Sequence, residues 1–130
     1  MRKWKVIRLI NNKVTQNMTL REIVKLLDAE VCVGEGRLDE DVTKAFASDL
    51  MSDVLTLKDT PILVTGLCNV QTIRTCDMAG LEVAIIVRNK KPSEEMLELA
   101  EENDMTIIAC PYSLFKACGL LYNAGLQPLY

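Results

Sequence analysis

Polar residues that directly follow apolar segments are the part of this sequence best suited to binding a ligand. If those segments are parallel strands, their carboxyl ends meet at one edge of a sheet, where ligands commonly bind. Helix N-termini at that edge offer backbone N–H groups to an anion, and Asn or Thr side chains can read a ribose or a base edge. We therefore expect a site for a nucleotide or another phosphate-bearing metabolite. Its candidate residues are Ser48, Asp49, Thr65, Gly66, Asn69 and Asn89.

The same residue types also have a simpler interpretation, because Asn69 is a preferred helix N-cap and Asp49 suits the first turn of a helix. Asp49 and Asp53 lie four positions apart, so on a helix they would share a face that could meet a magnesium ion. Magnesium usually needs further oxygen ligands, and we expect no bound metal and no cofactor. The two carboxylates would repel a bare phosphate unless a cation such as Arg88 intervenes.

Several residue types and motifs that commonly support catalysis are missing. The chain contains no histidine, which removes the usual proton shuttle at neutral pH and the Ser-His and Cys-His pairs. It contains no G-x-x-x-x-G-K-[ST] segment, and therefore no P-loop lysine. The "GEG" of residues 34–36 lacks the third glycine of a dinucleotide fingerprint and is typical of a turn. We expect a protein that is not an enzyme.

Five cysteines occur, at positions 32, 68, 76, 110 and 118. An odd number without close pairs indicates reduced thiols and a cytoplasmic protein. Cys68 and Cys110 would approach each other if both lay in loops above the sheet. A redox or iron–sulfur accessory role therefore stays open, beside the interpretation of the cysteines as small buried hydrophobic residues.

Length and composition fit one globular domain. The chain has 130 residues, of which 49% are hydrophobic and 25% charged, and no apolar run has the length of a membrane span. The basic N-terminal segment has no small-residue cleavage site, so we expect no export and no membrane partner. The net charge is −3 with scattered basic residues, and we expect no nucleic-acid partner.

Short apolar segments alternate with helical patterns along most of the chain. We expect strands over 29–33, 43–48, 61–65, 83–87 and 106–109. We expect helices over 19–27, 49–58, 69–79, 93–103 and 113–124. This alternation predicts an α/β fold with a mainly parallel sheet of about five strands that is covered on both faces.

The pattern over residues 18–125 resembles the DRTGG domain family, which includes the amino-terminal domain of HPr kinase/phosphorylase. The most specific part is "DVTKAFASDLMSD" at residues 41–53, with "PILVTGLCNVQTIRTCDMAGLEVAIIV" and "PSEEMLELAEENDMTIIACPYSLFKACGLLYNAG" after it. Where the family motif has Asp-Arg, Thr and two glycines, this chain has Asp39-Glu40, Thr43 and Lys44-Ala45.

The resemblance implies a three-layer α/β/α sandwich over residues 18–130, preceded at residues 1–17 by an extension that could form a strand. It also implies a non-catalytic regulatory or ligand-binding role. Relatives of this kind are fused to nucleotide-sensing CBS pairs or to phosphotransacetylase, or stand alone beside iron-only hydrogenase genes. The hydrogenase link is the second reason for keeping the redox alternative open.

Both ends of the chain carry more apolar residues than the helical stripes require. Small α/β domains with such a surplus commonly bury it against a symmetric partner, so we expect a homodimer, and a protein partner is a further candidate. The residues concerned are Trp4, Val6, Ile7, Leu9, Ile10, Leu120, Leu121, Tyr122, Leu126, Leu129 and Tyr130.

Overall fold

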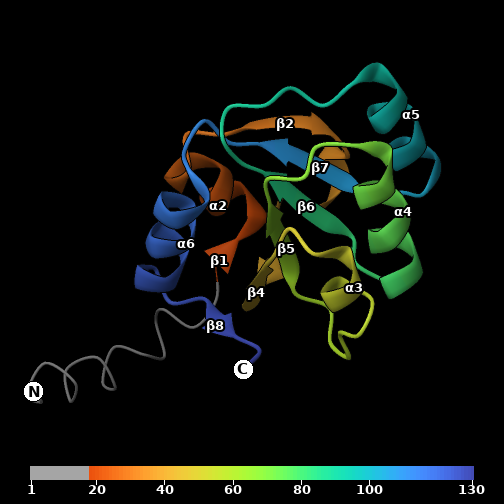
Figure 1. Cartoon of the computed structure of the whole chain (residues 1–130). Helices are drawn as coiled ribbons and strands as arrows, with labels where there is room; N and C mark the ends of the chain where they lie inside the picture. The colour runs from red at the N-terminus through yellow and green to blue at the C-terminus, as the bar shows by residue number, and fades with distance from the viewer. Residues whose placement is uncertain (1–17) are drawn as a thin grey trace, which may run out of the picture.

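A computed structural model describes residues 18–130 (Figure 1). Its strands are β1 (Met18–Thr19), β2 (Glu30–Val33), β3 (Asp41–Val42), β4 (Lys44–Ala47), β5 (Ile62–Thr65), β6 (Val83–Ile86), β7 (Thr106–Ala109) and β8 (Gln127–Pro128). Its helices are α2 (Leu20–Leu26), the 3-10 turn η1 (Glu35–Arg37), α3 (Met51–Val54), α4 (Val70–Ala79), α5 (Glu94–Glu102) and α6 (Leu114–Asn123). The strand expected within residues 1–17 lies outside the described residues.

Six strands form the main sheet in the order β2-β7-β6-β5-β4-β8. The strands from β4 to β7 follow one another in space as in sequence and are parallel, whereas β2 joins β7 antiparallel. The predicted mainly parallel α/β fold is therefore confirmed. The sheet has one strand more than the five expected, because β8 is a two-residue strand containing a proline, too short to recognise in the sequence.

Helices cover both faces of this sheet, which gives three layers (Figure 1). The chain steps in one direction from β4 to β7, so right-handed crossovers place α3, α4 and α5 on one face. From β7 the chain returns to the far edge to form β8, and α6 accordingly lies on the other face with α2. Strand residues alternate between the layers, since Leu63 packs with α4 while Ile62 and Val64 pack with α2 and α6.

Helix ends follow the expected capping chemistry. Thr19 forms a capping box with Glu22, and the side chains of Asn69, Ser93 and Ser113 accept hydrogen bonds from backbone N–H groups of α4, α5 and α6. These caps fix where each helix leaves the loop that follows the preceding strand. They therefore set the shape of the carboxyl edge of the sheet.

The helix expected over 49–58 is much shorter in the structure. It begins at Met51 and ends at Val54, and Asp49 lies in the loop before it. Asp49 and Asp53 consequently do not share a helix face, so the basis for a magnesium site there is wrong. The reason is that the Asp49 carboxylate is engaged by β5 and the residue after it, a long-range contact that local helix propensity does not reveal.

The "GEG" segment forms a turn, as expected. Gly34 has a φ of 85°, in the left-handed region that glycine tolerates. A Cβ at this position would also collide with the carbonyl oxygen of Met105 and with Thr106. The glycine is therefore needed where β2 turns away beside the start of β7.

Candidate functional site

The carboxyl edge of the sheet gathers the carboxyl-edge cluster, which we define as Asp49, Thr65, Gly66, Arg88 and Lys90. Asp49 follows β4, and its Oδ1 accepts hydrogen bonds from the Thr65 hydroxyl at 2.9 Å and from the Gly66 N–H at 2.7 Å. Both Thr65 and Gly66 are buried. Three of the six predicted site residues are therefore joined by hydrogen bonds to the Asp49 carboxylate.

The environment of Asp49 favours its charged form. The Gly66 N–H is the largest cause of a lowered pKa for this carboxyl, followed by the Thr65 hydroxyl and the nearby charges of Lys90 and Arg88, while partial desolvation opposes the shift. Asp49 is therefore a carboxylate over the neutral pH range and has its charge offset from several sides.

The two cations come from the loop after β6. Arg88 and Asn89 both have left-handed backbone conformations, with φ values of 71° and 57°. Their N–H groups donate to the carbonyl oxygens of Tyr112 and Cys110, which ties this loop to the one after β7. The ammonium group of Lys90 donates to the Gly66 carbonyl oxygen. The sequence prediction omitted Lys90, although its position just beyond a buried strand could have indicated it.

The other predicted residues have more local roles. The Ser48 hydroxyl accepts a hydrogen bond from the Leu50 N–H at 2.9 Å, and Asn69 Oδ1 accepts one from the Thr72 N–H at 3.1 Å. The side chain of Asn89 is exposed at the same edge. The capping interpretation of Asn69 is thus correct, and it leaves the amide nitrogen of that side chain as a donor.

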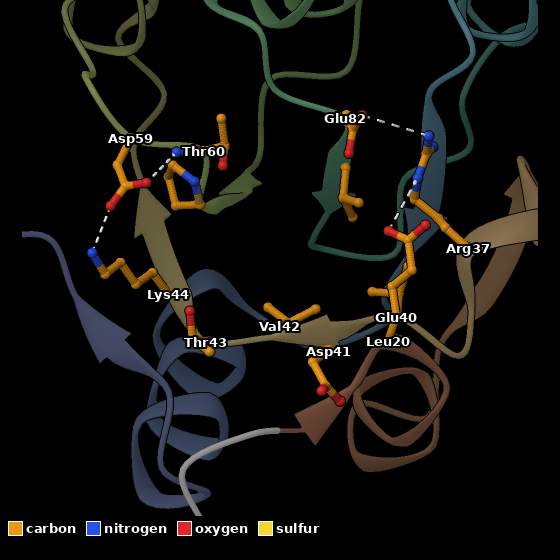
Figure 2. Close-up of a pocket in the computed structure, with 12 residues that line it drawn as sticks. Leu20, Arg37, Glu40, Asp41, Val42, Thr43, Lys44, Asp59, Thr60 and Glu82 are labelled. Carbon is orange, nitrogen blue, oxygen red and sulfur yellow. Dashed lines mark hydrogen bonds and ion pairs between the residues drawn. The ribbon is translucent and has the colours of Figure 1, made fainter.

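A polar cavity of about 250 Å³ lies at the opposite edge of the sheet, where β4, β5 and β6 begin (Figure 2). We call it the amino-edge cavity. Its lining consists of Leu20, Arg37 and residues 40–44, 59–61 and 82–83. Glu40, Thr43 and Lys44, which stand where the DRTGG motif would fall, all lie here and not at the carboxyl edge.

Charged side chains face each other across this cavity. Figure 2 shows Lys44 and Asp59 on one side, paired at 2.5 Å, and Arg37 with Glu40 and Glu82 on the other. Arg37 is only 12% exposed, and its nitrogens lie 3.9 Å from each of these two glutamates. Its Nε is buried without a hydrogen bond among residues 18–130.

Backbone and hydroxyl groups hold the Arg37 guanidinium more closely than the carboxylates do. Its Nη1 donates to the Asp104 carbonyl oxygen at 3.0 Å and to the Thr106 hydroxyl at 2.9 Å. The Thr106 hydroxyl in turn donates to the Gly34 carbonyl oxygen at 2.6 Å. These bonds connect the cavity wall to the Gly34 turn.

The structure gives no support to the alternative in which Cys68 and Cys110 approach each other above the sheet. Cys68 packs with the layer of α3, α4 and α5, whereas Cys110 is buried on the side of α2 and α6. Burial raises the pKa of all five thiols, that of Cys76 to about 12. Residues 18–130 contain no group of three or more Cys, Asp or Glu arranged to hold a metal ion.

Comparison with known proteins gives a match among solved structures. No family model and no curated protein matches the chain. A solved structure that matches contains the CBS and DRTGG domains of the regulatory region of Clostridium perfringens pyrophosphatase, in complex with an activator, diadenosine tetraphosphate. The TM-score is 0.68 at 22% identity; the match covers 90% of this chain, which spans 50% of the length of the other.

The match shows that this chain shares its α/β fold with part of a regulatory region. It agrees with the DRTGG resemblance at the level of fold and does not bear on the HPr kinase relative. In the part of the chain that the structure describes, none of the helices has the length and apolar character needed to cross a membrane.

Proposed function

We propose that this protein is a non-catalytic regulatory module that binds a nucleotide or another phosphate-bearing metabolite at the carboxyl-edge cluster. The proposal is supported by the shared fold, since the matching regulatory region is a complex with a nucleotide activator. It is also supported by the chemistry of the cluster, where Arg88 and Lys90 adjoin Gly66 in the loop that leads to α4.

The observation that carries the proposal is the state of Asp49. Its oxygen is hydrogen-bonded to Gly66 and Thr65, and its charge is met by two cations, Arg88 and Lys90. The sequence suggested that the Asp49 carboxylate would repel a phosphate, and these two cations offset that repulsion. Arg88 is exposed and Lys90 uses one of its three donors on Gly66, so both can still donate to phosphate oxygens.

The same geometry argues against catalysis. A general base that works near neutral pH needs a pKa near 7, whereas the pKa of Asp49 is lowered. A thiol nucleophile needs a lowered pKa, whereas burial raises that of every cysteine. Binding without turnover is the function that these groups support.

Calorimetry and amide chemical-shift mapping with AMP, ADP, ATP and diadenosine tetraphosphate test the binding site. We expect at least one of them to bind with a dissociation constant below about 1 mM and to shift residues 65–69 and 88–90. Arg88→Ala and Lys90→Ala should each weaken binding about tenfold or more, because each removes a charge-assisted hydrogen bond. Lys44→Ala, at the amino-edge cavity, is the matched control and should leave the affinity unchanged.

Two results would contradict the binding proposal. One is the absence of binding for the whole panel, and the other is a set of shifts confined to residues 40–44 and 59–61, which would assign the ligand to the amino-edge cavity. An ATP hydrolysis assay tests the second half of the proposal. Turnover that survives repurification and disappears in Asp49→Ala would show that the protein is an enzyme.

A further inference from the structure

An exposed apolar stripe runs along α6. Phe115, Cys118, Gly119 and Tyr122 follow the i, i+3, i+4, i+7 spacing and therefore lie on one side of the helix, which we call the α6 face. Phe115 is 89% exposed and Tyr122 is 67% exposed. Two aromatic rings two helical turns apart thus project from the same side of α6.

Beside these rings lies an apolar groove of about 390 Å³. Its floor comes from β4, β5 and the C-terminal segment, and includes Ala45, Ala47, Val64, Leu126 and Pro128. Of the residues expected from the sequence to serve a dimer, Leu121 and Leu126 are buried in the domain's own core, whereas Tyr122 is left at the rim of the groove. The groove is large enough to take in an aromatic side chain, and the α6 face presents two of them.

Gly119 lies between the two rings, in the middle of the helix. A Cβ built there meets nothing within 4 Å among residues 18–130 beyond its own stretch of helix. Glycine within a helix is destabilising relative to alanine, and α6 gains nothing from it in this fold. A missing side chain at this position is useful when another chain approaches the helix closely.

We propose that the α6 face is the interface of a homodimer with twofold symmetry, in which each copy inserts an aromatic ring of α6 into the groove of the other. A twofold interface brings the same surface together twice, so it needs a knob and a groove on one face. It also places like charges near each other, and no charged residue lines the groove within residues 18–130. The groove lining therefore offers no charged group that could select a partner of opposite charge.

The test is the oligomeric state at micromolar concentration, measured by light scattering and sedimentation equilibrium. We expect the wild-type protein at twice the 14.6 kDa of one chain. Phe115→Asp should raise the dimer dissociation constant at least about 100-fold, because it places two carboxylates in an apolar interface. Met78→Asp is the matched control, since Met78 is a similarly exposed residue on α4, and it should stay dimeric.

Gly119→Leu separates loss of the interface from loss of the fold. The leucine side chain blocks close approach of a second copy, so the variant should be monomeric. Because leucine also improves the helix propensity of α6, the urea midpoint of this monomer should not be lower than that of the wild-type monomer. A wild-type monomer would overturn the proposal, as would a dimer that survives both Phe115→Asp and Gly119→Leu. A monomer that dimerises only after removal of residues 1–17 would also overturn it, by assigning the groove to the chain's own N-terminal segment.

Discussion

The two edges of the sheet use polar residues in different ways. At the carboxyl edge, the Asp49 oxygen lies within 3 Å of two donors, one of them a backbone N–H, and this bond joins β4 to the end of β5. At the amino edge, Arg37 lies 3.9 Å from the glutamates of the cavity wall. Its guanidinium donates instead to the Asp104 carbonyl oxygen and to the Thr106 hydroxyl, beside the turn at Gly34. The comparison shows that a carboxylate holds one edge together, whereas the other is shaped by a mostly buried arginine and a backbone turn, with its carboxylates farther away.

The largest effect is expected at the Gly34 turn. Gly34→Ala requires an unfavourable left-handed backbone and brings a Cβ against the Met105 carbonyl, so we expect a loss of roughly 2–4 kcal/mol in the free energy of unfolding. Urea denaturation followed by circular dichroism measures it. Gly36→Ala is the control, because a Cβ there meets nothing within 4 Å among residues 18–130. Equal stability of the two variants would remove the turn from the explanation of the amino edge.

A smaller loss is expected at Asp49. Asp49→Ala leaves the buried Gly66 N–H and Thr65 hydroxyl without their acceptor, which should lower the free energy of unfolding by roughly 1–2 kcal/mol, since water can partly replace the carboxylate. Asp53→Ala, an exposed carboxylate on α3, should change it by less than about 0.5 kcal/mol. If the two variants lost the same amount, the carboxyl edge would not be held by hydrogen bonds to Asp49.

The pH dependence sharpens the same contrast. The pKa of Asp49 is lower in the folded protein, so its contribution is complete above the unfolded pKa of about 3.9 and is lost as the pH falls through the folded value. The difference in unfolding free energy between wild type and Asp49→Asn should therefore be constant from pH 5 to 7 and shrink below about pH 4. Urea midpoints at several pH values measure it, and a difference that grew on acidification would contradict this assignment.

The smallest effect is expected for the ion pair at the mouth of the amino-edge cavity. Lys44 and Asp59 pair at 2.5 Å, but both side chains are nearly half exposed, and solvent screens such pairs. Lys44→Ala should leave the thermal midpoint within the error of the measurement at physiological salt. A clear decrease that persists at 1 M salt would show that the Lys44–Asp59 ion pair stabilises the amino edge.

Local patterns in the sequence predicted most of the fold because β5, β6 and β7 are apolar and almost completely buried and four helices carry side-chain caps. The patterns failed at β8, which is two residues long, and at α3, whose first turn is displaced by the contact of Asp49 with Gly66. Six site residues, five of them polar and one a glycine, were predicted from their position at or after the ends of strands. Which of them would already be engaged by the protein's own backbone depends on contacts far apart in the sequence, and no local pattern contains that information.

The antiparallel pairing of β2 with β7 has a consequence for the order in which the protein assembles. Glu30 is opposite Ala109, so about eighty residues of chain must be synthesised before the first long strand of the domain finds its neighbour. Contacts between such distant residues form slowly because a long loop has to close first. During synthesis, β2 therefore stays unpaired until β7 has been made, whereas β4, β5 and β6 can already associate. A chain that stops before Thr106 lacks both β7 and β8, so it would leave β2 unpaired and both edges of the β4-β5-β6 sheet open, and we expect such a fragment to aggregate.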